Sequence, residues 1–228
     1  MNKNLFMKRE ICPICGKTTK QPHFKAKTYR LVNTDYDLYT HYKGVNPILY
    51  SAKICNYCGY ANLVNVFEKP SKVLRTLRET SMVLNESWKP WDIPEENDFE
   101  YAIKLHKLVL MNYMNDKDLL TGELGYICLK LYWLYKQCGN EKEMLRFRKL
   151  ALTNLESCYS NQRFPIFDAI DNIKTMYIIA ILSYYEGDIE KCKMWLSLVL
   201  QNKLTSNKIK AKAIDFKYEF LKSIKVNS

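Results

Sequence analysis

Two Cys-x-x-Cys-Gly motifs constrain the fold of this chain more than any other feature of its sequence. They read Cys12-Pro-Ile-Cys15-Gly and Cys55-Asn-Tyr-Cys58-Gly. Each motif places two thiolates on a tight turn, and four thiolates form the tetrahedral set that most often binds Zn²⁺. The glycine after each second cysteine permits a positive φ, which lets the backbone amide approach the sulfur. We therefore predict one structural Zn²⁺ per chain, held by Cys12, Cys15, Cys55 and Cys58.

The alternative, in which these cysteines are buried thiols or disulfides, fits poorly because nothing in the sequence indicates export. The N-terminal stretch MNKNLFMKRE carries charge but has no apolar segment behind it, unlike a signal peptide. No apolar run reaches the roughly 18 residues that a membrane span requires. We therefore expect a cytoplasmic protein without a membrane partner, in a compartment that keeps thiols reduced.

The net charge of +11 is concentrated at the two ends of the chain. Residues 1–66 contain 10 Lys/Arg and 3 Asp/Glu, a balance of +7, and residues 203–228 contain 7 and 2, a balance of +5. The middle of the chain is nearly neutral. A basic field of this kind attracts nucleic acid or acidic proteins. A lysine- and asparagine-rich composition, typical of AT-rich genomes, explains the excess equally well.

The 39 residues between the two motifs are expected to carry their own structure. β-forming residues alternate loosely over 24–32, 36–42 and 48–54, and turn-forming residues separate these stretches. We predict three short antiparallel strands, within a zinc-ribbon-like β-module that spans residues 1–68. Zinc would supply much of the folding free energy of so small a sheet, because structural zinc contributes on the order of 10–16 kcal/mol in small peptides.

From about residue 70 the pattern becomes helical. A helix is expected to start at Pro70-Ser71, and a segment rich in tryptophan and proline follows, so we assign residues 69–96 to a linker helix and an ordered connection. A second helix is predicted over 99–114. Repeat helices then fill 97–228, and residues 69–228 together are predicted to form a second, all-α domain.

The helical part repeats itself. Residues 131–147 align with 179–195, and each copy reads as a helix, a Gly-Asn or Gly-Asp turn and a second helix, with Gly139 matching Gly187. This pattern resembles the tetratricopeptide repeat, although the spacing of 48 residues exceeds the usual unit of about 34. A last helix over 209–224 would cap the array. The fold class predicted is thus α+β, a small antiparallel β-module followed by a helical-hairpin domain.

Helical-hairpin arrays bind peptides along the concave face that their first helices line. We therefore predict a non-enzymatic zinc-binding scaffold or adaptor whose partner is another protein; the oligomeric state is open. By analogy with the repeat pattern, the partner groove would be lined by Tyr126, Leu129, Trp133, Lys136, Lys174, Tyr177, Ile181 and Tyr184.

Two other functions remain open. Nucleic acid could bind Lys25, Lys27, Arg30 and Lys43, which alternate with tyrosines, since cations and stacking rings hold single strands; tyrosine-rich strands are also ordinary β-structure. More distantly, an enzyme could use the carboxylates of Asp35-Tyr-Asp37, although such a pair more often caps a turn or pairs with an arginine. A four-cysteine zinc has no position free for a substrate.

The cysteine motifs stand within a longer pattern. CPICG is followed by Arg30, Asp35-x-Asp37, Tyr42-x-Gly44-x-Asn46-Pro47-x-x-Tyr50 and Cys55-x-x-Cys58-Gly-Tyr-Ala61. This run resembles an uncharacterised bacterial family, domain of unknown function 2225, whose members join such a cysteine module to a helical, repeat-like region. The resemblance implies a cytoplasmic bacterial metal-binding protein and no known reaction.

Overall fold

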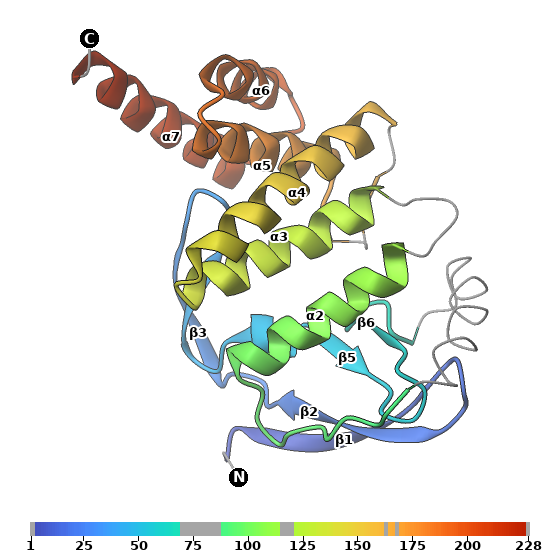
Figure 1. Cartoon of the computed structure of the whole chain (residues 1–228). Helices are drawn as coiled ribbons and strands as arrows, with labels where there is room; N and C mark the ends of the chain where they lie inside the picture. Colours follow the sequence, from blue (N-terminus) through green and yellow to red (C-terminus); the bar gives the residue numbers. More distant parts are fainter. Residues whose placement is uncertain (1–2, 69–87, 115–120, 162–163, 167–168, 227–228) are drawn as a thin grey trace.

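The computed structural model describes residues 3–68, 88–114, 121–161, 164–166 and 169–226. Within them the chain forms three antiparallel hairpins followed by six helices, which confirms the α+β class (Figure 1). The helix predicted to begin at Pro70 lies outside the described residues.

Each hairpin is a separate two-stranded sheet. The Cys12–Cys15 motif forms the turn of the first hairpin, and the Cys55–Cys58 motif forms the turn of the third. A short 3-10 helix, η1 (Pro47–Tyr50), precedes the third hairpin. The paired strands are β1 (Leu5–Ile11) with β2 (Thr18–Phe24), β3 (Tyr29–Thr34) with β4 (Thr40–Gly44), and β5 (Ala52–Ile54) with β6 (Ala61–Leu63).

The predicted strand boundaries are wrong at two turns. The first predicted strand, 24–32, is broken at 25–28, where Lys27 adopts a φ of 66°. The second, 36–42, begins in a turn where Leu38 also has a φ of 66°, and β4 starts only at Thr40. Positive φ is uncommon for residues other than glycine, so neither turn is visible in the composition of the sequence. The third predicted strand, 48–54, is divided between η1 and β5.

The helices follow the prediction more closely. They are α2 (Phe99–Met114), α3 (Thr121–Gln137), α4 (Glu141–Ser160), α5 (Asn172–Tyr185), α6 (Ile189–Gln201) and α7 (Asn207–Val226). Both predicted helical hairpins form, as α3–α4 and α5–α6. Gly139 and Gly187 end the first helix of each hairpin at φ values of 67° and 84°. Asn140 and Asp188 then cap the second helices by accepting from the backbone N–H three residues on. The repeat type itself stays a prediction.

One hydrophobic core joins the β-module to the helices. Ile54 and Leu63 of the third hairpin lie in the same buried cluster as Leu105 of α2 and Tyr177 of α5. Figure 1 shows α2 between this hairpin and the remaining helices, with β1–β2 farthest from the array. The proposed division at residue 68/69 therefore does not separate two independent cores in the part of the chain described here, and the domain boundary stays a prediction.

Candidate metal centre

Each cysteine motif closes a hairpin turn in the same way. The N–H of Gly16 donates to the carbonyl of Cys12, and that of Gly59 donates to the carbonyl of Cys55, each over 2.9 Å. Both glycines have the positive φ that the sequence predicts, 69° and 75°. The two turns bring their thiols to one point between β1–β2 and β5–β6.

The four sulfur atoms are arranged as a metal site requires. The Sγ atoms of Cys12, Cys15, Cys55 and Cys58 all lie within 4.8 Å of one another. Cys12 Sγ is 3.7 Å from Cys58 Sγ, and Cys15 Sγ is 3.6 Å from Cys55 Sγ. A tetrahedron with metal–sulfur bonds of about 2.3 Å has edges of about 3.8 Å. The cluster could therefore hold a metal ion, and the thiols are not joined by disulfides.

The electrostatics of the cluster favour a cation. Hydrogen bonds from the thiols of Cys12 and Cys58 lower the pKa of Cys55 well below that of a free thiol. The same contacts raise the pKa of Cys12 to about 12 through Cys55, and raise that of Cys58 through Cys12 and Cys55. One thiolate thus forms readily, and each further negative charge meets repulsion from the first. A bound cation removes this repulsion and lets all four sulfurs ionise.

Apolar and hydrogen-bonded residues enclose the cluster. Cys12, Cys55 and Cys58 are almost fully buried and pack with Tyr60 and Phe67. Trp88 lies over the second motif and donates from Nε1 to the carbonyl of Asn56, over 2.9 Å. These neighbours restrict access to the sulfurs, as expected for a structural metal site rather than a catalytic one.

A buried ion pair joins β1 to β5 close to the cysteine motifs. Lys53 Nζ of β5 is 2.6 Å from Glu10 Oε1 of β1, and His23 Nε2 of β2 is 3.0 Å from the same oxygen. Burial acts to raise the pKa of Glu10, but the hydrogen bond and charge of Lys53, with the charge of His23 and the hydrogen bond from Lys8, together outweigh it and the pKa is lowered. The pair therefore links the first and third hairpins at Glu10 and Lys53, each two residues before a cysteine motif.

The acidic pair singled out in the sequence has a structural role. We define residues 35–39, between β3 and β4, as the acidic turn. Asp37 is fully buried and accepts hydrogen bonds from the Tyr39 N–H at 3.0 Å, from Tyr132 Oη at 2.7 Å and from Lys136 Nζ at 2.9 Å. Asp35 accepts from the same Lys136 at 2.9 Å. Both carboxylates thus bind α3 through Lys136.

The acidic turn also reaches α7. The ring of Tyr36 packs edge-on against Phe216, with 5.0 Å between centroids, and its hydroxyl donates to Glu219 over 2.7 Å. Lys212 Nζ donates to the carbonyl oxygens of Thr34 and Asp35. The turn therefore sits between the first and last helices of the array, where the sequence predicted an open groove.

The structure corrects the predicted groove at several positions. Leu129, Tyr177 and Ile181 are fully buried and have no surface to offer a partner. Trp133 is 9% exposed and contacts Tyr39 of the acidic turn. The remaining members of the set are Tyr126, Lys136, Lys174 and Tyr184, and these are half-buried. The acidic turn of the β-module binds α3 through Tyr132, 95 positions away from Asp37, and α7 through Glu219, 183 positions away from Tyr36, and local patterns do not reveal such contacts.

The four predicted nucleic-acid contacts lie on the surface. Lys25, Lys27, Arg30 and Lys43 are all exposed, and Arg30 lies directly opposite Lys43 in the β3–β4 ladder. Sequence reasoning missed a second pair of this kind, Arg9 opposite Lys20 in β1–β2, because the pairing register cannot be read without the turn between the strands. In the described part of the chain, no helix has the length and apolarity that crossing a membrane requires.

Comparisons with known proteins agree with the resemblance seen in the sequence. The model of the family described as "Uncharacterized protein conserved in bacteria (DUF2225)" matches residues 5–220, which includes all four clustered cysteines and α2 to α6. Searches of curated proteins and of solved structures find no match. With nearly its whole length matched, the chain belongs to the uncharacterised bacterial family DUF2225.

Proposed function

We propose that this chain is a non-enzymatic scaffold protein of the cytoplasm, built around one structural Zn²⁺. The observation that carries the proposal is the four-thiolate cluster, whose sulfur atoms lie within 4.8 Å of one another inside a shell of buried residues. Sulfur-only tetrahedral sites select zinc or iron among the common metals, and a single mononuclear site of this geometry favours zinc. Four sulfurs fill its coordination shell and leave no position for a substrate.

The proposed zinc stabilises the β-module by joining two of its hairpins. Neither cysteine-bearing hairpin has a core of its own, since two-stranded hairpins are at best marginally stable. The metal joins the turn of β1–β2 to the turn of β5–β6, and β5–β6 packs into the core shared with α2. Zinc therefore fixes the outer hairpin to the helical array through the inner one.

An enzymatic role for Asp35 and Asp37 has little support. A catalytic carboxylate needs an accessible oxygen and a pKa near the working pH. The Asp37 side chain is fully buried, and Asp35 forms an ion pair with Lys136 and a hydrogen bond with His41. Burial acts to raise the pKa of Asp35, but the Lys136 and His41 hydrogen bonds outweigh it, so the group stays ionised at neutral pH.

A scaffold acts through its surfaces, and the acidic turn packs against α3 and α7 in the region of the predicted groove. A protein partner at that groove stays a prediction. It would have to contact the half-buried Tyr126, Lys136, Lys174 and Tyr184, or the small cleft of about 190 Å³ beside Trp133, between β4, η1 and α3. The β1–β2 and β3–β4 hairpins, by contrast, carry the exposed cations Arg9, Lys20, Arg30 and Lys43.

The proposal is tested by the metal content of two single-cysteine variants purified without chelators. Cys55→Ser removes a buried member of the cluster and should lose the zinc that the wild type carries. Cys138→Ser changes an exposed cysteine outside the cluster and should retain one zinc per chain. Equal metal content in the two variants, or a wild type without zinc, would contradict the proposal.

A further inference from the structure

Two pairs of positive side chains face each other across strands of the β-module. Arg9 of β1 is the ladder partner of Lys20 of β2, and Arg30 of β3 is the partner of Lys43 of β4. All four side chains are exposed. The Cβ atoms of directly opposed residues lie about 4.5–5.5 Å apart, and like charges in such positions destabilise a hairpin. The fold thus contains the same unfavourable arrangement twice.

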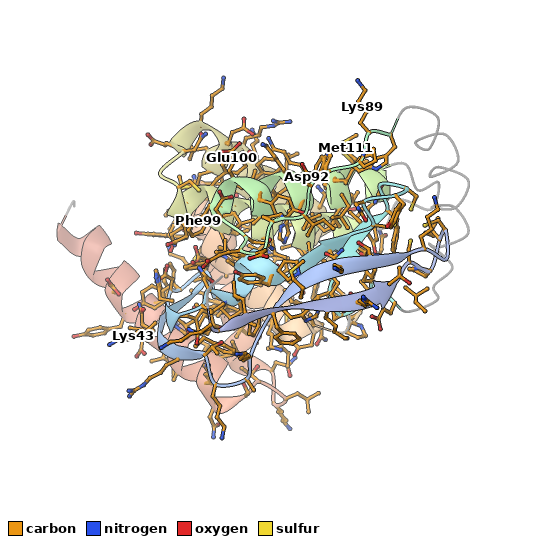
Figure 2. The ribbon with its side chains drawn as sticks, turned by 90° about the horizontal axis from the view of Figure 1, so that it is seen from below. Lys43, Lys89, Asp92, Phe99, Glu100 and Met111 are labelled. Carbon is orange, nitrogen blue, oxygen red and sulfur yellow. The ribbon has the colours of Figure 1, made fainter. Side chains whose placement is uncertain are left out.

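Nothing in the described residues compensates these four charges. No described carboxylate forms an ion pair with any of them, whereas Lys8 of β1 and Lys53 of β5 both contact Glu10. Figure 2 views the molecule from the side of β1–β2 and shows Lys43 at the rim, well away from Asp92 and Glu100 beside α2. The acidic side chains of that segment therefore do not neutralise the β3–β4 pair.

An aromatic row connects the two hairpins. Phe24 at the end of β2 contacts Tyr29 at the start of β3, with 5.3 Å between ring centroids, and Tyr29 contacts Tyr42 of β4 at 5.4 Å. Tyr29 is 40% exposed and Leu31, next on the same face, is 51% exposed. Because side chains alternate along a strand, β3–β4 presents rings on one face and the Arg30–Lys43 pair on the other.

Resting on the scaffold function above, we propose that the β1–β2 and β3–β4 hairpins together bind single-stranded nucleic acid. Arg9, Lys20, Arg30 and Lys43 contact phosphates, and the nucleic-acid strand crosses the unpaired edge of β3, so that one base stacks with Tyr29 on the opposite face of the hairpin. Closely spaced cations suit a polymer that carries one negative charge per nucleotide, and an exposed ring suits its bases. Bound phosphates would also relieve the repulsion within each pair. An acidic protein would satisfy the cations but would leave the ring without a stacking partner.

The salt dependence of binding tests the phosphate contacts. The zinc-loaded full chain is titrated with a fluorescently labelled single-stranded oligonucleotide of mixed sequence, and anisotropy is followed at several salt concentrations. Four contacts predict a slope of log K against log salt of about −2.8, since each contributes about −0.7. Arg9→Gln with Lys20→Gln, or Arg30→Gln with Lys43→Gln, should each flatten the slope by about 1.4.

A matched control removes the same charge elsewhere. Lys149→Gln with Lys203→Gln deletes two exposed lysines, one on α4 and one between α6 and α7, neither of which forms an ion pair with a described residue. This variant should keep the wild-type slope. If it weakens binding as much as the hairpin variants do, the attraction is a property of the net charge and the assigned surface is wrong.

Thermal melts of charge variants test whether the opposed cations bind a ligand or stabilise the fold. Lys43→Gln and Lys20→Gln relieve repulsion across their strands, so each should melt at the wild-type temperature or above it while binding more weakly. A lower melting temperature for both would mean that these cations stabilise the fold, which contradicts the argument from repulsion.

The identity of the polymer is tested with Tyr29→Leu and with polyglutamate. The substitution should weaken oligonucleotide binding by about 5- to 150-fold, the equivalent of one lost stack. Polyglutamate that binds as tightly as the oligonucleotide, with no loss in Tyr29→Leu, would assign the surface to an acidic protein. Folded, zinc-loaded protein that binds no oligonucleotide at low salt would overturn this inference and leave the scaffold proposal standing, whereas a chain without zinc would overturn the scaffold proposal itself.

Discussion

At the scale of single residues, the two glycines of the cysteine motifs have the same backbone conformation in different surroundings. A Cβ added to Gly59 would lie 2.7 Å from two ring atoms of Trp88, whereas one added to Gly16 would meet nothing within 4 Å. Both replacements incur the cost of a left-handed residue, about 1–2 kcal/mol. Only Gly59→Ala must also displace the indole that covers the second motif.

We therefore expect Gly59→Ala to lower the free energy of unfolding clearly more than Gly16→Ala. Urea denaturation measures this difference, and a colorimetric zinc-release assay should show faster metal loss from Gly59→Ala. Equal effects of the two substitutions would show that Trp88 does not pack on the metal centre in solution.

A second pair of matched residues lies in the acidic turn. Asp37 is fully buried and holds Lys136 and Tyr132, while Asp35 contacts the same lysine from a side chain that is 23% exposed. Asp37→Asn should cost about 2–3 kcal/mol, because buried hydrogen bonds to a charge are lost, and Asp35→Asn about 1 kcal/mol. Urea denaturation of both variants measures the ranking. A larger loss for Asp35→Asn would mean that the turn is not docked as described.

The pH dependence of stability carries a further prediction. The pKa of Asp35 in the folded chain lies below its ordinary value of 3.8, since the hydrogen bonds from Lys136 and His41 outweigh the effect of burial. Its contribution is therefore present above pH 3.8 and is lost as the pH falls through the lower, folded value. The difference in unfolding free energy between the wild type and Asp35→Asn should shrink on acidification. A difference that grows on acidification would contradict the assigned contacts. Acid would also release a bound metal, but it would do so in both proteins, so this effect cancels when their unfolding free energies are compared.

At the scale of secondary-structure elements, the second helix of each helical hairpin buries an aromatic side chain at the same aligned position. Phe147 of α4 and Trp195 of α6, which the sequence alignment pairs, are both buried. Trp133 of α3 is buried to the same degree as Trp195, at 9% and 8% exposed, because the acidic turn covers it. The expectation from sequence that Trp133 faces an open groove is therefore replaced.

Trp133→Ala and Trp195→Ala should each cost on the order of 3–5 kcal/mol, as large core truncations do. Thermal melts measure the loss. Proteolysis distinguishes the two variants, since only Trp133→Ala removes a contact with Tyr39 and should expose the β3–β4 region to cleavage. Near-wild-type stability for Trp133→Ala would restore the open-groove interpretation.

Helices and strands differed in how far the sequence could predict them. The predicted helix over 99–114 is found with those bounds, and the Gly139 and Gly187 turns are confirmed, because long apolar periods and glycine caps are local signals. The cysteine cluster was predictable for the same reason. Strand boundaries were not, since Lys27 and Leu38 turn the chain without a glycine or proline. The role of Asp37 depends on Tyr132, 95 residues away, which no local pattern records.

At the scale of the whole molecule, the metal centre is coupled to the helices through a shared core. Residues of β5 and β6 pack with α2, and Asn112 of α2 donates to the carbonyl of Ala61 over 2.9 Å. Removal of zinc with a chelator should therefore unfold β1–β2 and β5–β6 and loosen α2, while α3 to α7 keep most of their helical content. Hydrogen exchange measured before and after chelation shows which of these elements unfold. Exchange that stays unchanged in all parts of the chain would show that the metal does not support the fold.

We propose that Cys12, Cys15, Cys55 and Cys58 together hold one structural Zn²⁺. X-ray absorption at the zinc edge of the purified protein identifies the atoms bound to the metal. We expect one zinc per chain, surrounded by four sulfur atoms at about 2.3 Å with no oxygen or nitrogen ligand. A coordination shell that contains nitrogen or water, or a protein that binds no zinc at all, would contradict it.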